Sequence, residues 1–171
     1  GALKNLFITA DINQTGTLQP HPSRTEQVLT TAPAQSIKLD EISTSSPIDW
    51  LIFDDNNDIV DAIAHGQNTL RGALLVQVKL SFNNQSLVLL GQTEQFLTNM
   101  GYELYGFTNQ TSISCIKLPL NTTKTIASKT KSVDAIFLKN SEWLKNTDDN
   151  RKMKLAFLSH SAFGFYDLCY L

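Results

Sequence analysis

Acidic and amide side chains follow directly after an apolar run at residues 48–53, and they form the segment Asp54-Asp55-Asn56-Asn57-Asp58. A carboxylate at the end of a strand can pair with an ammonium group or accept a hydrogen bond from a hydroxyl. We therefore predict Asp54 and Asp55 as catalytic residues and Asn57 as a substrate-binding residue. The alternative is structural, with Asp58 capping a helix and Asp55 at the positive end of its dipole, and the two roles can coexist.

Further polar residues are expected near the same place. Thr15 and Thr17 flank a glycine in a predicted turn, and they would line the site if their hairpin reached over the tip of the sheet. Ser81 and Asn83 end the second apolar run, which favours the same side of the sheet. All four are candidate substrate-binding residues. The alternative for each pair is turn chemistry that needs no ligand.

Histidine and cysteine spacing argues against a metal site. The three histidines are isolated, and no carboxylate or cysteine stands at ligand spacing from any of them, so we expect structural roles and no metal. Cys115 and Cys169 fit neither a disulfide framework nor a zinc motif and are expected to be buried free thiols.

Two apolar runs, Ile48–Phe53 and Ala73–Phe82, enclose one helical segment, as in a buried parallel βαβ unit. Open α/β sheets bind ligands at the carboxyl ends of such strands, where the acidic segment lies. Flanking patterns complete the expected elements, which are strands within 3–12 and 28–39, a helix at 59–70, a helix at 93–100, strands at 102–107, 113–118 and 133–138, a helix from 140 and a long C-terminal helix. The strands at 102–107 and 133–138 have no clear helix between them, which favours a terminal antiparallel pair.

Composition fits a single α/β domain, since the chain has 171 residues and is 42% hydrophobic. We expect a hairpin-like cover and linker at 1–47, a core sheet at 48–138 and C-terminal helices at 139–171. The formal charge of -2 favours neither nucleic acid nor anionic lipid as a partner. Apolar runs are too short for a membrane span and no signal peptide is evident, so a cytoplasmic location is expected.

The order of these segments resembles the FkbM family of S-adenosylmethionine-dependent methyltransferases. The signature strand of that family ends in Leu-Lys-Ile-Asp-Val-Glu-Gly-x-Glu, and Trp50–Asp58 takes its place, with Asp54 on the motif's Asp. Upstream, Ile37–Ile42 resembles the Leu-Asp-x-Ile segment of the family. Downstream, Phe96–Leu104 resembles its passage from helix to strand, and Tyr166–Leu168 its C-terminal helix. The resemblance spans almost the whole chain.

The resemblance implies a partial Rossmann-like sheet of parallel strands with a terminal antiparallel pair, flanked by helices. It also implies methyl transfer from S-adenosylmethionine to a hydroxyl acceptor. Two departures stand out. Asn56, Asn57 and Ile59 replace the motif's Glu, Gly and second Glu, and the chain has no Gly-x-Gly segment to hold the cofactor. The chain therefore resembles a C-terminal half, and its cofactor-binding residues are unknown.

Two other classes of function stay open from the sequence. One is a non-catalytic domain that binds a partner, and the other is a small-molecule binding module that uses the same strand ends. A half-fold would leave the strand at residues 48–53 as an unprotected edge. The upstream segment, a second copy of the chain or a separate N-terminal half would then have to cover it.

Overall fold

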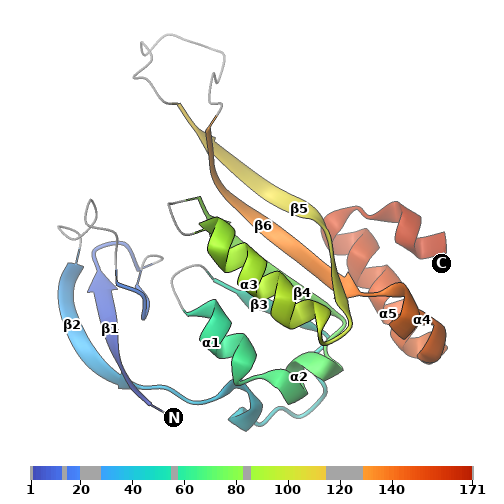
Figure 1. Cartoon of the computed structure of the whole chain (residues 1–171), viewed down its shortest axis with the longest axis horizontal. Coiled ribbons are helices and arrows are strands. Elements are labelled where there is room, and N and C mark those ends of the chain that lie inside the picture. The colour runs from blue at the N-terminus through green and yellow to red at the C-terminus, as the bar shows by residue number, and fades with distance from the viewer. Residues whose placement is uncertain are drawn as a thin grey trace.

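A computed structural model describes residues 2–12, 15–19, 28–54, 58–82, 86–114 and 129–170, with only the backbone at 86 and 87. These residues form a four-stranded sheet, a separate two-stranded sheet and a set of flanking helices (Figure 1). The predicted α/β class is therefore confirmed at the level of a mixed sheet with helices.

The four-stranded sheet has the order β3-β4-β6-β5, and its strands are β3 (Trp50–Phe53), β4 (Leu75–Ser81), β6 (Lys129–Lys139) and β5 (Tyr102–Ile113). β3 pairs parallel to β4, while β6 lies antiparallel between β4 and β5. Both the predicted parallel pair and the predicted antiparallel pair are confirmed. β3 forms one edge of the sheet, and its only partner within the described residues is β4.

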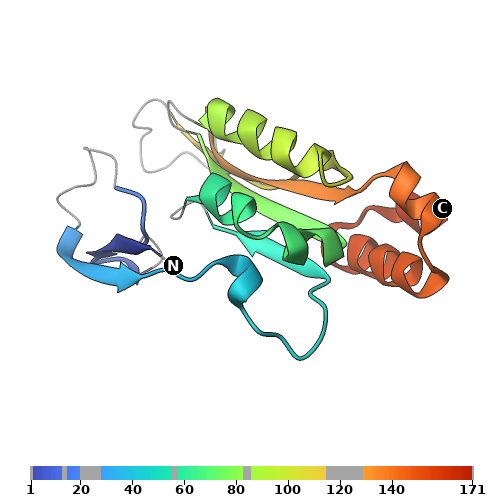
Figure 2. The same ribbon diagram turned by 60° about the horizontal axis from the view of Figure 1, so that its bottom comes forward.

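Three helices, α1 (Ile59–Ala64), α2 (Gln67–Gly72) and α3 (Ser86–Thr98), cover one face of this sheet (Figure 2). Between them lies the larger apolar core, to which Ile63, Leu70, Val76, Leu97 and Phe137 contribute fully buried side chains. Alternation along the strands explains this layer, because residues two apart on a strand share a face.

The C-terminal elements cover only one end of the other face (Figure 2). They are α4 (Ser141–Asn146), α5 (Asp149–Leu158), the π-helical turn Ser159–Phe163 and the 3-10 turn Tyr166–Tyr170. A second core forms there around Leu75, Ile136, Leu138 and Leu155, with Trp50 packed against it. The predicted helix start at residue 140 is confirmed, since the Asn140 side chain accepts a hydrogen bond from the Trp143 amide.

The continuous helix predicted over residues 59–70 is wrong, because it breaks between α1 and α2 at His65 and Gly66. At this break Leu39, which begins a 3-10 turn, Leu39–Glu41, approaches Gly66 closely. A Cβ atom added at Gly66 would lie 2.5 Å from Leu39 Cδ2, so only glycine fits without rearrangement. The strand expected within residues 28–39 ends at Gln35, before that turn begins.

Other boundaries also differ from the predictions. Ile113 ends the long strand β5 instead of starting a strand of its own, and residues 115–118 lie outside the described residues. The long C-terminal helix is wrong as well, because Gly164 adopts a left-handed conformation (φ 69°) that ends the helical turns. Cys169 is an exposed free thiol rather than a buried one, and Cys115 is not described.

The hairpin made by β1 (Leu3–Thr9) and β2 (Val28–Gln35) forms its own antiparallel sheet. It contacts α1 through an ion pair in which Lys4 Nζ lies 2.6 Å from Asp61 Oδ2. It does not pair with β3, so among the described residues it adds no strand at that edge of the four-stranded sheet.

Candidate functional site

Asp54 follows the last residue of β3 and faces the neighbouring strand β4. The register pairs Phe53 with Val78, which places Asp54 level with Lys79. The Lys79 ammonium lies 3.4 Å from Asp54 Oδ1, and the two side chains are 41% and 50% exposed. The candidate catalytic carboxylate therefore has a cation beside it at the carboxyl end of the parallel pair.

Further polar groups continue from this pair across the sheet. Lys79 stands opposite Asp134 in the β4–β6 register. Asp134 Oδ2 accepts hydrogen bonds from Gln77 Nε2 at 2.8 Å and from Asn109 Nδ2 at 2.7 Å. We call Asp54, Lys79, Gln77, Asp134 and Asn109 the polar row. Asp54 directly follows β3, and the other four residues lie in β4, β6 and β5. The row lies on the face that carries the C-terminal helices, beyond the end of the second core.

Burial distinguishes the two ends of the polar row. Gln77 and Asp134 are each only 8% exposed, so their hydrogen bonds hold the middle of the row in place. Asn109 reaches Asp134 from an irregular part of β5, where its φ of 51° accompanies a register shift. Asp54 and Lys79, at the end of the row next to β3, remain accessible. The row thus offers a carboxylate and an ammonium on a fixed base, groups that can orient a hydroxylated ligand.

Four members of the polar row were missed in the sequence, namely Gln77, Lys79, Asn109 and Asp134. Gln77 and Lys79 interrupt the apolar run of β4 at alternate positions, which places both on one face. Asp134 interrupts the run of β6 in the same way. That alternation was the available signal, but it gives no information about which strand lies opposite.

The predicted substrate-binding residues have different outcomes. Ser81 is the last residue of β4, so it lies at the carboxyl end of the parallel pair, as Asp54 does and as expected. Thr15 instead bonds within its own loop, where Thr15 Oγ1 accepts a hydrogen bond from the Thr9 amide at 3.2 Å. Turn chemistry therefore accounts for Thr15. Thr17 belongs to the same loop, which an isolated bridge from Phe7 to Gly16 ties to β1.

Asp55, Asn57 and Asn83 lie outside the described residues, so their predicted roles stay predictions. The capping role is confirmed for Asp58, whose side chain accepts a hydrogen bond from the Asp61 amide at 3.1 Å at the start of α1.

S-adenosylmethionine does not fit the residues of this chain alone. The cofactor class needs a glycine-rich turn that lets backbone amides approach it, and no Gly-x-Gly segment occurs in the sequence. The one candidate carboxylate described, that of Asp54, is already beside Lys79. A cofactor site would need further polypeptide.

Comparisons with protein-family models, curated proteins and solved structures find no match for this chain.

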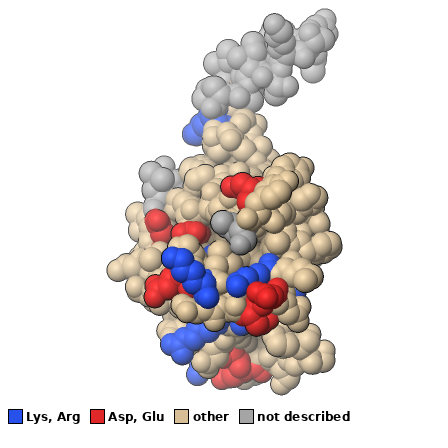
Figure 3. Space-filling view, turned by 90° about the vertical axis from the view of Figure 1, so that its right-hand side faces the viewer, with Lys and Arg blue, Asp and Glu red and all other residues tan. Residues whose placement is uncertain are grey.

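No helix among its described residues is long and apolar enough to cross a membrane. On the face shown in Figure 3, lysine and arginine side chains are interspersed with acidic ones, so the described residues of that face form no extended basic patch.

Proposed function

We propose that this chain is the C-terminal half of an FkbM-like methyltransferase, which transfers a methyl group from S-adenosylmethionine to a hydroxyl acceptor. The cofactor would be held by a second polypeptide segment that adds strands along β3. In this proposal the polar row, which includes Asp54, faces the boundary between this chain and the added segment and orients the acceptor. Methyl transfer depends mainly on positioning, so it requires no nucleophile or metal of this chain.

The observation that carries the proposal is the order and direction of the strands. Parallel strands β3 and β4 are followed by a terminal pair in which β6 runs antiparallel. The resemblance found in the sequence implies this arrangement for a C-terminal half. The position of Asp54, directly after the edge strand, supports the same alignment.

The edge strand itself supports an additional segment. The Ile52 side chain is 60% exposed because it points away from the larger core, on the face opposite to its neighbours Leu51 and Phe53. An exposed apolar edge strand promotes pairing with another strand. A cofactor-binding half seated along β3 would cover Ile52 and lie beside Asp54.

Calorimetry with S-adenosylmethionine and S-adenosylhomocysteine tests the proposal on two proteins, namely this chain and the complete polypeptide in which its sequence occurs. We expect saturable binding by the complete polypeptide and none by the chain of 171 residues. Binding by this chain alone would contradict the half-domain proposal, and failure of both to bind would exclude the enzyme.

A non-catalytic partner-binding domain is the second candidate, and the Asp54–Lys79 ion pair favours it, because a carboxylate beside a cation needs no ligand. Both candidates require a partner along β3. They differ in that only the methyltransferase binds the cofactor, so the same calorimetry separates them.

A further inference from the structure

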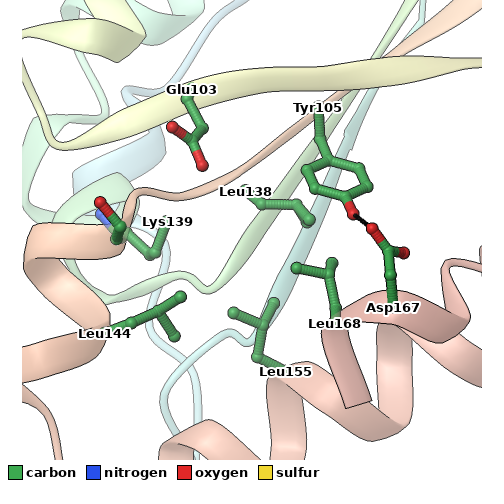
Figure 4. A pocket seen from close by; sticks show the side chains of 9 residues that line it. Glu103, Tyr105, Leu138, Lys139, Leu144, Leu155, Asp167 and Leu168 are labelled. Atoms are coloured by element: carbon green, nitrogen blue, oxygen red, sulfur yellow. Dashed lines mark hydrogen bonds between the residues drawn. The ribbon is translucent and has the colours of Figure 1, made fainter. Parts of the chain in front are cut away.

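A cavity of about 320 Å³ lies at the end of the sheet opposite Asp54. Leu138, which lines the cavity, pairs with Leu75, the first residue of β4. The cavity therefore lies at the start of β4, whereas Asp54 lies near its end. The cavity opens between the start of β5 and the C-terminal helices (Figure 4). Its volume falls within the range of small-molecule sites, of about 300–1,000 Å³.

Four leucines from the sheet and the C-terminal elements form the apolar wall, and they are Leu138, Leu144, Leu155 and Leu168. Leu138 and Leu155 are 1% and 3% exposed, so this wall is continuous with the second core. In Figure 4 the leucine side chains point toward the centre of the cavity. Such a wall suits an aliphatic chain.

The polar part of the cavity comes from Glu103 and Tyr105, two residues apart on β5, and from Asp167. The Tyr105 hydroxyl donates a hydrogen bond to Asp167 Oδ2 (Figure 4). Burial, together with the neighbouring Asp167 and Glu103 carboxylates, raises the pKa of Tyr105 to about 12. The phenol therefore stays protonated and holds the Asp167 carboxylate at the cavity.

Neither acid at the cavity has a cationic partner within the described part of the chain, in contrast to Asp49 and Asp61, which pair with lysines. Lys139 also lines the cavity, but its ammonium is turned away from it. Lys139 Nζ lies 3.7 Å from the centre of the Tyr102 ring and donates a hydrogen bond to the Met100 carbonyl at 3.1 Å. Ser141 adds a neutral hydroxyl to the lining, and the exposed Glu103 and Asp167 carboxylates are the charged acceptors, which no described ion pair neutralises.

We propose that this cavity binds a small aliphatic amine, with the alkyl chain against the leucines and the ammonium between Glu103 and Asp167. An ammonium supplies only donors, and the carboxylates supply only acceptors. A neutral alcohol of equal length would keep the apolar contact and lose the charge-assisted hydrogen bonds. This site is remote from Asp54 and does not depend on the proposed methyl transfer.

Calorimetry or NMR titration with pentan-1-amine tests the proposal on the unmodified protein, and pentan-1-ol serves as the neutral probe of equal length. We expect pentan-1-amine to bind about tenfold more tightly than the alcohol, since one charge-assisted hydrogen bond corresponds to roughly that factor. Absence of saturable pentan-1-amine binding, or equal affinity for both probes, would overturn the proposal.

Substitutions then locate the bound amine. Glu103→Gln and Asp167→Asn keep the size of each side chain and remove its charge, so each should weaken pentan-1-amine binding about tenfold. Glu142→Gln changes an exposed acid of α4 that does not line the cavity and should leave the affinity unchanged. If neither cavity variant weakens binding, or if Glu142→Gln weakens it equally, the amine does not bind here.

Discussion

The Asp54 carboxylate lies 3.4 Å from the Lys79 ammonium across the parallel pair β3–β4. Both side chains are about half exposed, so solvent screens their attraction. An ion pair of this kind contributes little to folding. Its place at the carboxyl end of the edge strand is where we propose that the acceptor binds.

A double-mutant cycle with Asp54→Asn and Lys79→Met should give a coupling energy of about 0.2–1 kcal/mol in urea unfolding. The exposed pair Asp49–Lys154, with Oδ2 and Nζ 2.8 Å apart, provides a matched cycle. A coupling of several kcal/mol, seen only for Asp54 and Lys79, would show that their role is structural.

Tyr102→Phe should destabilise the protein by about 1–3 kcal/mol, because it leaves buried acceptors without their donor. The Tyr102 hydroxyl lies 2.6 Å from the Leu70 carbonyl oxygen and 2.7 Å from that of Ala73, at the end of α2. Chemical denaturation measures the effect. Tyr170→Phe, at a side chain that is 91% exposed, is the control and should change nothing measurable.

Lys139 should make stability depend on pH. Burial, and to a smaller extent Arg151, lowers the pKa of Lys139 to about 8 from 10.5. The unfolded chain therefore binds more protons between these values, and stability should rise with pH there, by up to about 1.4 kcal/mol per pH unit. Below pH 8 both states are protonated and this dependence vanishes.

Comparison with Lys139→Met isolates the Lys139 contribution. Between pH 8 and 10, the free energy of unfolding of the wild type should increase relative to that of the variant. Tyrosine ionisation adds an opposite slope only at higher pH, because burial raises the pKa of Tyr102 above its ordinary value of 10.0. Parallel pH profiles of the two proteins would show that Lys139 keeps an ordinary pKa.

Gly66→Ala should destabilise the protein by about 1–3 kcal/mol through overpacking against Leu39. The added Cβ would meet Leu39 Cδ2 at 2.5 Å and the Ala62 carbonyl oxygen at 3.0 Å. Combining it with Leu39→Ala should be less damaging than the sum of the single changes. In thermal melts, Gly91→Ala is the control, because nothing lies within 4 Å of its added Cβ and alanine favours the helix α3, in which Gly91 lies. A loss of stability there equal to that of Gly66→Ala would contradict overpacking as the cause.

The main strands could be predicted because their residues are almost continuously apolar. Ile48–Phe53 and Ala73–Phe82 both contain the strands that form, and Asp58 caps the helix between them. The close contact between Gly66 and Leu39 could not be predicted, because Leu39 lies far away in the chain. Local periodicity contains no information on such tertiary contacts.

The polar row shows the same limit within the candidate site. Asp54 was accessible from sequence because it ends an apolar run, whereas its neighbour Lys79 depends on the register of β3 and β4. Asn109 lies in β5 and Asp134 in β6, both more than fifty residues after Asp54 in the sequence. Their hydrogen bond also depends on a register shift in β5. Pairing of strands distant in sequence assembles the row.

The central claim is that a cofactor-binding half lies along β3. Its most direct test is to measure S-adenosylhomocysteine binding by the variant Ile52→Glu of the complete polypeptide that contains this chain. Ile52 is 60% exposed on β3, and the proposed cofactor-binding half would cover it, so glutamate should weaken S-adenosylhomocysteine binding more than about tenfold by placing a charge in that junction. Met153→Glu, at an apolar residue of α5 that is 70% exposed, is the control and should bind like the wild type. Binding that survives Ile52→Glu unchanged, or a wild type that binds no cofactor product, would contradict the proposal that β3 joins this chain to a methyltransferase.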